Sequence, residues 1–460
     1  MFDEYQMDEL PHNGPAKRQR PLIESNRCDN EQSDCYHEVL EGSYNGPLRH
    51  SWFNTTHAIG AGRPCDTGRL PDENDDSGLS PIESLRRQLL QVKRRLWPAA
   101  EQCAQATGMS SAQSEFSSAR RICNPMEPLG EGRAGGLNNL FMNRSAIKLA
   151  NMDAILDFSL TTKTNTAAGP FLFVDLCGAP GGFSEYIMKR YQSEHTSGEC
   201  RGYGMSLKGS NEHGRGIQWK LAPEVSETNG GVQTKYLICH GMDGTGDIYK
   251  WENVISMQHA IETDLCYSGI SQQKVNLVLA DGGMDVQRDS ECQEELAQKL
   301  VVCQVAAGLF LLQQEGTLIV KMFGFQTLVL KSLMRNLFEG FDQITVLKPI
   351  SSRPASSERY VVCSGFKGLP MGWDGLKWMN SVFMGDWYYR DQPLDENLAL
   401  FMERCDRDLF TLNLKACFSI LSCMERKAAA MKADSWDKSD WCPERPAVNV
   451  GLYKRAWRLG

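Results

Sequence analysis

The sequence predicts an α/β protein: a mostly parallel sheet with helices on both faces, followed by a helical C-terminal extension. Three observations predict this fold class. From about residue 140, short apolar runs alternate with longer segments of helical periodicity. One of these runs, FLFVDLC at 171–177, leads into a turn of small residues, as strands of parallel sheets commonly do. After residue 370 the pattern changes to tryptophan-rich segments with helix-forming residues.

Size and composition permit such a domain and exclude several other classes. The chain has 460 residues, 41% hydrophobic and 23% charged, which is ordinary for a globular protein. Its formal net charge of −8 argues against coating nucleic acid by bulk charge, while a local basic cleft is compatible with it. There is no apolar run of about 18 residues and no signal peptide, so we expect no membrane association. The 16 cysteines are spread over a long chain without a signal peptide, and several lie in apolar runs, which predicts reduced thiols. The absence of a CxxC pair argues against a cysteine-rich zinc site, and we expect no metal.

The first 80 residues are expected to form a mostly disordered leader. They are rich in Asn, Asp, Glu, Ser, Gly and Pro and show little hydrophobic periodicity. Within them, Lys17–Arg20 is a candidate nuclear-import signal, with a solvated basic tail as the alternative.

Residues 81–118 are predicted to be a helical or linker segment. Leucines at helical spacing over 81–105 follow a Ser-x-x-Glu start at Ser80, which predicts an amphipathic helix without indicating its partner. Arg86–Arg87 and Lys93–Arg95 are basic clusters for which a solvated face is the simplest interpretation.

The alternating pattern defines a domain over 119–370 and an extension over 371–460. Strands are predicted at 171–177, 201–207, 274–283, 316–323, 342–350 and 359–366. Helices are predicted at 183–191, 291–314 and 327–341, and in the extension at 397–421.

The most informative motif is the turn after the first of these strands. In FVDLCGAPGGF (173–183) a buried strand passes through small residues into a helix, so a ligand can approach the backbone at the carboxyl edge of the sheet. The spacing is neither G-x-G-x-x-G nor a Walker loop, which disfavours nicotinamide and nucleoside-triphosphate sites. A tight turn without a ligand is the alternative, and the proline and Asp175 argue against it.

FVDLCGAPGGFSEYI resembles the D-x-C/G-x-x-P-G-G-F/W-S motif of the FtsJ-like ribose methyltransferases. The resemblance implies a Rossmann-like methyltransferase fold with a seven-stranded sheet, and S-adenosylmethionine as the cofactor. The cofactor-binding residues that it implies in this turn are Asp175, Cys177, Gly178, Ala179, Pro180, Gly181, Gly182 and Phe183.

A second loop, GMDGTGDI at 241–248, fits the same pocket. Its Asp247 and Ile248 are expected at the adenosine end of the cofactor, where a carboxylate can accept hydrogen bonds. The alternative is a surface turn or a calcium-like loop, but the glutamate that ends an EF-hand loop is missing.

FtsJ-like enzymes resemble one another in a Lys-Asp-Lys-Glu tetrad, and each member has a candidate here. Lys148 lies on a segment before the cofactor strand, and Asp281 ends the 274–283 run. Lys321 ends the next apolar run, where a lysine is costly to bury unless it is paired or functional. Glu358 precedes the last strand. Each residue alone has an ordinary explanation, such as a solvated or turn residue, but four in the expected order argue against coincidence.

Two roles are open for Lys321. A ribose 2′-hydroxyl is a poor nucleophile and needs a base or a strong hydrogen-bond partner, together with positioning. If its neighbours lower its pKa, Lys321 can accept the hydroxyl proton; otherwise it orients the hydroxyl and stabilises negative charge.

Longer segments over about 119–425, among them ARRICNP and SSRPASSERYVVC, are similar to the eukaryotic cap-specific mRNA 2′-O-methyltransferases that form cap 1. This resemblance implies methylation of the first transcribed nucleotide of capped mRNA, in the nucleus. Arg120, Gln293 and Ser356 are the implied RNA or cap contacts. The capping and transcription machinery are implied partners, but the sequence shows no counterpart of the G-patch, guanylyltransferase-like and WW modules of larger animal members.

Two alternatives stay open. One is a cap-2 or structural-RNA ribose methyltransferase, with the same chemistry on another RNA. The other is an inactive RNA-binding relative, against which the complete set Lys148, Asp281, Lys321 and Glu358 argues, because binding alone does not need it.

Overall fold

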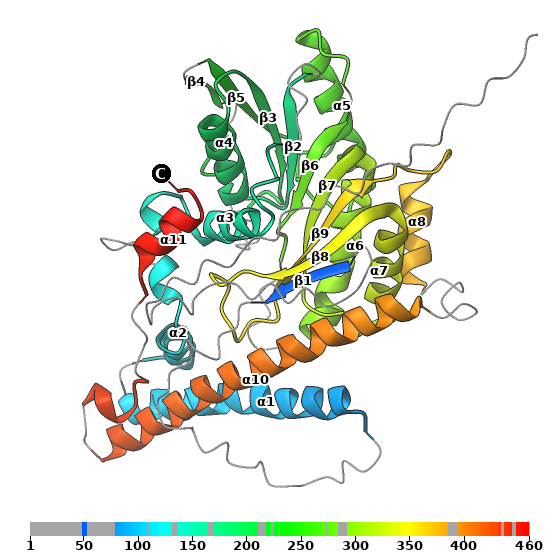
Figure 1. Ribbon diagram of the computed structural model, residues 1–460. Coiled ribbons are helices and arrows are strands. Elements are labelled where there is room, and N and C mark those ends of the chain that lie inside the picture. The colour runs from blue at the N-terminus through cyan, green and yellow to red at the C-terminus, as the bar shows by residue number, and fades with distance from the viewer. Residues whose placement is uncertain are drawn as a thin grey trace, which may run out of the picture. The chain divides into compact units, whose positions relative to one another are not determined.

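The computed structural model describes most of the chain (Figure 1). The described residues are 48–52, 79–108, 110–130, 137–162, 169–209, 218–221, 225–229, 231–272, 274–283, 292–384, 394–433, 437–443 and 448–459. All of them belong to one compact unit, residues 37–460. Of the predicted leader, 48–52 form a strand; nearly all the rest, Lys17–Arg20 included, lies outside the described residues.

A nine-stranded sheet forms the centre of the described structure, in the order β1-β8-β9-β7-β6-β2-β3-β5-β4. Its strands are β1 Leu48–Trp52, β2 Phe171–Leu176, β3 Gly198–Met205, β4 Val225–Asn229, β5 Val232–Ile238, β6 Val275–Ala280, β7 Leu312–Met322, β8 Phe341–Lys348 and β9 Arg359–Phe366. β9 is antiparallel to both its neighbours and β4 to β5, while the other pairs are parallel.

The strand order confirms the predicted fold class. Without the edge strands β1 and β4, the seven strands numbered along the chain have the order 3-2-1-4-5-7-6, which is typical of Rossmann-like methyltransferases. The sheet is therefore mostly parallel, as predicted, with two further strands at its edges.

Helices cover both faces of the sheet, because its central strands are apolar on both sides. In β2, Leu172 and Val174 belong to one core cluster and Phe171 and Phe173 to the other, as alternation along a strand requires. The first cluster includes α5 Trp251–Tyr267, α6 Gln293–Leu311, α7 Leu328–Gly340 and α8 Gly375–Phe383. The second includes α3 Arg144–Ile155, α4 Gly182–Glu194 and α11 Val450–Ala456.

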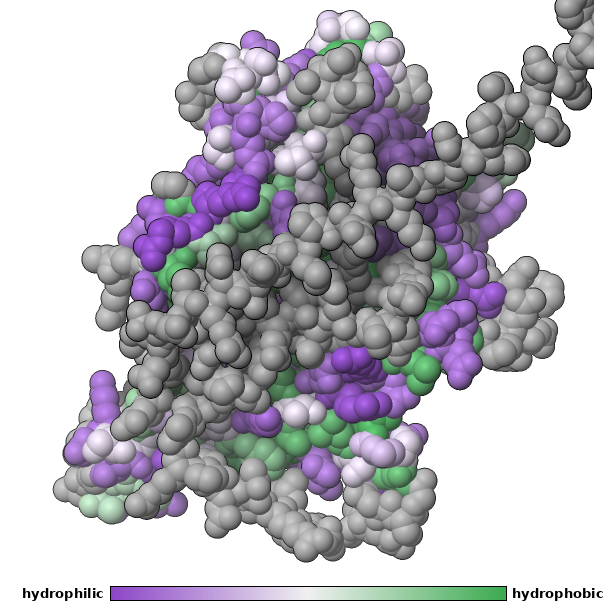
Figure 2. Space-filling model, in the orientation of Figure 1, coloured by the Kyte–Doolittle hydropathy of each residue, from purple (hydrophilic) through white to green (hydrophobic). Residues whose placement is uncertain are grey.

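A third hydrophobic core lies outside the sheet, between helices that precede and follow the strands β2 to β9 in the sequence. α1 (Pro81–Thr107) packs along α10 (Glu396–Lys432), with α2 (Ala112–Ile122) beside them (Figure 1). Apolar residues of α1 and α10 form this core, and Figure 2 shows hydrophobic side chains along the helix pair. The partner of the predicted amphipathic helix is therefore α10. Its start is as predicted: the Ser80 hydroxyl accepts from the Glu83 amide, and the Ser80 amide donates to the Glu83 carboxylate.

Two elements near the site were not predicted. β5 alternates buried and more exposed residues, including Lys235, because it lies between β3 and the short edge strand β4. α5 buries Val254, Met257, Ile261 and Leu265 at helical spacing. In the part of the chain that the structure describes, no helix has the length and apolar character needed to cross a membrane.

Candidate active site

The four tetrad candidates come from four elements that meet at the carboxyl edge of the sheet. Asp281 directly follows β6, and Lys321 is next to the last residue of β7. β9 runs antiparallel to β7 with Tyr360 opposite Lys321, so Glu358, just before β9, lies at the end of β7. Lys148 is on α3, which packs on the same sheet.

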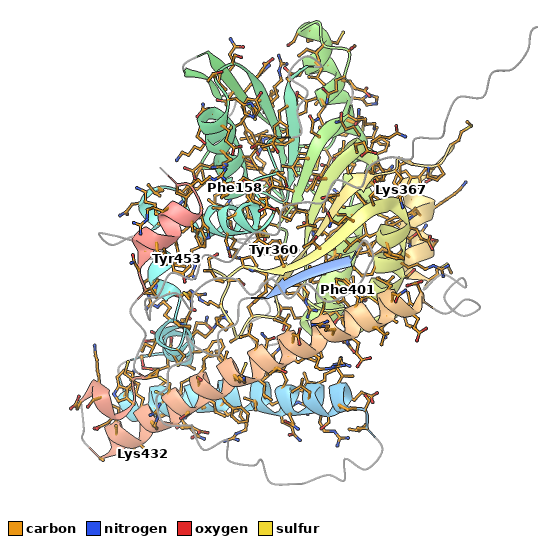
Figure 3. All side chains as sticks on the ribbon, in the orientation of Figure 1. Phe158, Tyr360, Lys367, Phe401, Lys432 and Tyr453 are labelled. Atoms are coloured by element: carbon orange, nitrogen blue, oxygen red, sulfur yellow. The ribbon has the colours of Figure 1, made fainter. Side chains whose placement is uncertain are left out.

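The structure brings all four side chains into one chain of contacts. Lys321 Nζ lies 3.0 Å from Asp281 Oδ1 and 3.9 Å from Glu358 Oε2. Lys148 Nζ lies 2.8 Å from Glu358 Oε1. The Tyr360 hydroxyl, inside the molecule (Figure 3), donates to Asp281 Oδ1 at 2.7 Å and fixes that carboxylate from the other side.

Opposite charges decide the protonation of this cluster. Burial works to raise the pKa of Glu358, but Lys148, Lys321 and Lys348 together hold it well below its usual range. Burial likewise works to lower the pKa of Lys321, but Asp281 and Glu358 raise it above its ordinary value. Lys321 is therefore an ammonium at neutral pH in this arrangement.

Lys348 is a member of the site that we did not predict. It is only 3% exposed, and its Nζ donates to Ser352 Oγ at 3.1 Å, Ser356 O at 2.6 Å and Glu358 O at 2.7 Å. Burial lowers its pKa to about 7. The sequence held a signal for it, because Lys348 ends an apolar run, ITVLK, just as Lys321 does.

The loop that carries Glu358 is held from outside the sheet domain by Asn413 of α10. Asn413 is fully buried; its Nδ2 donates to Pro354 O at 2.6 Å and Ser356 O at 3.1 Å, and its Oδ1 accepts from Ser357 Oγ at 3.0 Å. The loop therefore depends on the C-terminal extension for its conformation.

We expect Asn413→Ala to lower both stability and activity. The change removes three hydrogen bonds and leaves Pro354 O without this partner, while Ser356 O keeps Lys348, so we expect a cost of about 1–3 kcal/mol. Chemical denaturation and methyl-transfer kinetics measure the two effects. Asn380→Ala, at an exposed position on α8, is the control. A variant with full activity and stability would show that Asn413 does not hold the loop.

The glycine-rich turn at the end of β2 has the geometry of a ligand-binding loop. Cys177 has a left-handed φ of 56°, which is uncommon for a residue with a side chain and marks local strain. A Cβ on Gly178 would lie 2.2 Å from the Asp175 carboxyl carbon, and one on Gly282 would lie 2.9 Å from Cys177 Cβ. Ala179 and Pro180 form the turn, and Gly181, with φ 109°, precedes α4. A side chain at Gly178 or Gly282 would therefore collide with its neighbours, so the close packing of this turn requires glycine.

Asp175 supplies an observation that fits a cofactor. It is fully buried; its Oδ2 accepts from Ser184 Oγ at 2.6 Å, but its Oδ1 has no hydrogen-bond partner among the described residues. S-adenosylmethionine carries amino and hydroxyl donors, so the residues present fit it. Gly182 and Phe183 begin α4 and are buried.

Two further loops reach the same edge. The Lys208 amide donates to Thr245 O at 2.7 Å, which ties the loop after β3 to the predicted 241–248 loop. Asp247 is partly buried and Ile248 is 6% exposed. The Asp247 carboxylate acts on the buried Cys177 thiol electrostatically and helps raise its pKa, although burial is the largest cause. The structure therefore brings Asp247 near the glycine-rich turn.

The pH dependence of cofactor binding tests the role of Asp175. Burial raises its pKa to about 7, so much of it is protonated below neutrality. If the cofactor donates to Oδ1, binding favours the carboxylate, and affinity rises with pH up to about pH 7 and then levels off. We expect up to about a tenfold change per pH unit below that point, measured by calorimetry with S-adenosylhomocysteine. Asp175→Asn should bind without this pH dependence; a sloped profile in that variant would exclude Asp175 as its source.

The predicted RNA contacts lie on three different elements. Arg120 lies near the end of α2 and lines a small pocket together with Arg353 of the Glu358 loop. Ser356 is in that same loop, and its hydroxyl accepts from the Glu358 amide at 3.2 Å. Gln293 is the first residue of α6, a separate element. The structure thus brings Arg120 and Ser356 to one loop and places Gln293 on another.

Glu127 joins parts of the site that sequence reasoning did not connect. It is 4% exposed, and its Oε1 lies 2.7 Å from Arg144 Nη1 on α3 and 3.3 Å from Arg353 Nη2. Arg144 also donates to Ser351 O at 3.0 Å. The helix of Lys148 and the loop of Glu358 are thereby fixed to each other. Over the described ranges, no group of three or more His, Cys, Asp or Glu is placed to hold a metal ion.

Fold and site together define a Rossmann-like methyltransferase domain. Residues 141–366 match the FtsJ-like methyltransferase family, and this part of the chain is an FtsJ-like methyltransferase domain. The prediction of S-adenosylmethionine, the cofactor that this family uses, is confirmed by the match.

Curated relatives extend the similarity. The chain is 32% identical over 296 residues to mouse "Cap-specific mRNA (nucleoside-2'-O-)-methyltransferase 1", covering 62% of this chain and 32% of the relative. It is 34% identical over 236 residues to the protein of that name from Xenopus laevis, covering 49% and 26%. The chain thus spans about a third of the length of the mouse relative. A putative ribosomal RNA methyltransferase structure from Plasmodium falciparum is 19% identical, with a TM-score of 0.31, over 49% of this chain and 99% of that one.

Proposed function

We propose that this chain transfers a methyl group from S-adenosylmethionine to the ribose 2′-hydroxyl of the first transcribed nucleotide of capped mRNA, forming cap 1. The observation that carries the proposal is the contact chain Lys148–Glu358–Lys321–Asp281 beside a glycine-rich cofactor loop. When bound, the cofactor supplies a methyl group on a sulfonium. The protein must then hold a hydroxyl in line with it.

In this proposal Lys321 orients the hydroxyl. Its raised pKa keeps it an ammonium, and an ammonium cannot accept the hydroxyl proton. It can donate a hydrogen bond to the 2′-oxygen and stabilise the negative charge that develops there. As the oxygen–methyl bond forms, the sulfonium–methyl bond breaks, S-adenosylhomocysteine leaves and the hydroxyl proton passes to solvent. Asp281 and Glu358 hold its Nζ in place, and Lys148 balances the charge of Glu358.

Cofactor binding is assigned to the glycine-rich turn from Asp175 to Phe183 and to the loop of Asp247 and Ile248. The turn offers a tightly packed glycine backbone and a buried carboxylate oxygen without a hydrogen-bond partner among the described residues, and the second loop lies next to it. The RNA is assigned to the surroundings of Arg120, Gln293 and Ser356.

The choice of capped mRNA rests on similarity to proteins named as cap-specific methyltransferases. From the same similarity we propose a nuclear location. The capping and transcription machinery stay predicted partners. A cap-2 or structural-RNA ribose methyltransferase is the runner-up, because the tetrad would serve either substrate. An inactive relative is disfavoured by the complete tetrad.

One experiment separates these readings. The protein is incubated with labelled S-adenosylmethionine and short RNAs that end in a methylated guanosine cap, an unmethylated cap or a triphosphate, and the methylated nucleotide is mapped. We expect label on the 2′-oxygen of the first nucleotide of capped RNA. Label on the second nucleotide, or only on uncapped structured RNA, would replace the cap-1 assignment with the runner-up.

A further inference from the structure

One face of α1 carries positive charge that the proposed chemistry does not use. Between Glu83 and Glu101 the helix has five cationic residues and no acidic one, in a chain of net charge −8. The cationic residues are Arg86, Arg87, Lys93, Arg94 and Arg95. Such local charge against an acidic background points to an anionic partner.

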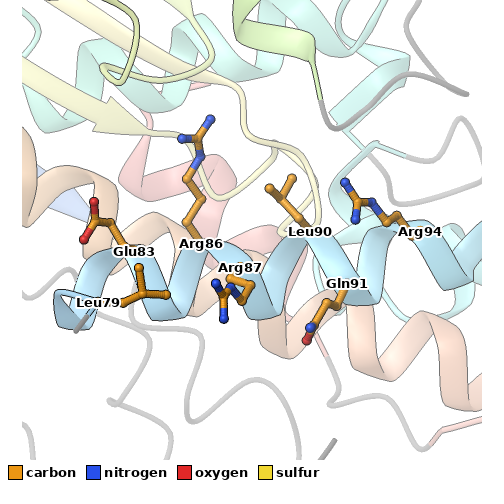
Figure 4. Close-up of a pocket in the computed structure, with 7 residues that line it drawn as sticks. All are labelled: Leu79, Glu83, Arg86, Arg87, Leu90, Gln91 and Arg94. Carbon is orange, nitrogen blue, oxygen red and sulfur yellow. The ribbon is translucent and has the colours of Figure 1, made fainter. Parts of the chain in front are cut away.

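These cationic residues lie on different sides of α1. The side of α1 with Leu89, Val92 and Leu96 is buried in the core that it shares with α10. Arg86, Leu90 and Arg94 point to one side of the helix in Figure 4, and Lys93 follows Arg86 by seven residues, two turns along. We call Arg86, Arg87, Lys93 and Arg94 the α1 basic face. Arg95 lies outside it and pairs with Glu425 of α10 at 3.0 Å.

Two contacts connect the α1 basic face with the candidate active site. Lys93 Nζ lies 3.3 Å from the hydroxyl of Ser357, the residue before Glu358. Arg86 Nη2 lies 3.7 Å from Glu295 Oε1 on α6, two residues from Gln293. The face therefore runs between the two elements that carry Ser356 and Gln293, the predicted RNA contacts.

A cavity lies against this face. Its volume is about 470 Å³, and its described lining comes entirely from 79–94 (Figure 4). The lining has three arginines and one carboxylate, so its net charge is positive; its residues are Leu79, Glu83, Arg86, Arg87, Leu90, Gln91 and Arg94. Three guanidinium groups beside a small apolar surface suit phosphate groups joined by sugars, because arginine binds phosphate through paired N–H donors.

We propose that the α1 basic face binds the phosphates of the RNA strand downstream of the methylated nucleotide. This inference rests on the proposed function, since it takes the strand from the tetrad along the helix that touches both flanks of the site. The contacts are to backbone, so they add affinity without sequence preference. A substrate too short to reach α1 gains nothing from them.

The test compares RNA lengths in the Arg87→Gln/Arg94→Gln double variant. Capped RNAs with one nucleotide and with about ten nucleotides are methylated over a range of salt concentrations. For the long RNA we expect KM to rise several-fold, and the slope of log affinity against log salt to shrink by about 0.7 per lost phosphate contact. For the short RNA we expect unchanged kinetics.

Arg95→Gln/Arg407→Gln is the matched control. It removes the same charge from exposed pairs with Glu425 and Glu403, outside the α1 basic face. Equal loss in this control, or equal loss on both RNA lengths, would overturn the proposal in favour of bulk charge. Higher activity of the Arg87/Arg94 variant would also overturn it and indicate an acidic polypeptide segment as the occupant.

Fluorescence anisotropy with the same RNAs keeps the two proposals separate. If the wild-type chain methylates neither RNA, the proposed function fails. Length-dependent and salt-dependent binding that the double variant loses would then still support the α1 basic face as an RNA surface. Binding that is independent of both length and variant would reject that surface whatever the activity.

Discussion

Replacing Lys321 by alanine is expected to abolish most methyl transfer while leaving cofactor binding intact. Lys321 Nζ is held 3.0 Å from Asp281 Oδ1 and contacts Asp281 O at 2.7 Å, at the point where the four elements of the tetrad meet. Without it, the tetrad loses the ammonium that we propose faces the 2′-oxygen, and Lys148 remains paired with Glu358. Loss of one such electrostatic partner lowers kcat by about 10²- to 10³-fold.

Single-turnover kinetics with capped RNA measure this loss, and calorimetry with S-adenosylhomocysteine measures the retained binding. Lys367→Ala, at a half-exposed lysine just after β9, is the control and is expected to behave as wild type. Undiminished transfer by Lys321→Ala would remove Lys321 from the chemistry. Loss of transfer together with cofactor binding would mean that the change disturbs the loop rather than the reaction.

Much of the fold is predictable because the hydrophobicity of the local sequence identifies the central strands of the sheet. β2, β6 and the second half of β7 are buried and mostly apolar, since helices cover both faces of the sheet at these positions. β5 is not predicted in this way, because it lies beside the short edge strand β4 and has polar residues at its more exposed positions. Local hydrophobicity thus identifies the middle of the sheet better than its edge.

The tetrad is predictable for a related reason. Lys321 and Asp281 each follow an apolar strand, where a charged side chain needs an explanation, and family resemblance supplies Lys148 and Glu358. The residues that hold the tetrad in place cannot be predicted from the local sequence. Asn413 is a polar residue in a long helix, and only the folded chain shows that it holds the loop from Pro354 to Ser357, which lies 56 to 59 residues earlier in the sequence.

The packing of the helical extension is likewise not predictable from the local sequence. The sequence predicts helices after residue 370 but not their role, because no local pattern states that α10 packs along α1 and reaches the Glu358 loop. α10 lies outside the family match at 141–366, whereas the loop residues that Asn413 contacts lie within it.

Breaking the buried ion pair between Arg359 and Asp406 is expected to cause the largest loss of stability. Arg359 is fully buried and Asp406 is 1% exposed; Arg359 Nη1 lies 2.5 Å from Asp406 Oδ1, and Gln326 Nε2 also donates to Asp406. Asp406→Ala leaves the guanidinium buried without this partner, and loss of one member of a buried pair costs about 3–5 kcal/mol. Chemical denaturation measures it.

Two further variants distinguish the loss of a buried ion pair from the loss of an exposed one. Glu403→Ala on the same helix removes an exposed pair with Arg407 and is expected to cost less than about 0.5 kcal/mol. Arg359→Met/Asp406→Leu replaces the pair with apolar side chains and should recover much of the stability, because it leaves no unpaired charge. Since Arg359 follows Glu358 directly, Asp406→Ala should also slow methyl transfer. If the Asp406→Ala protein were as stable as the Glu403→Ala protein, this ion pair would not be what fixes α10 to β9.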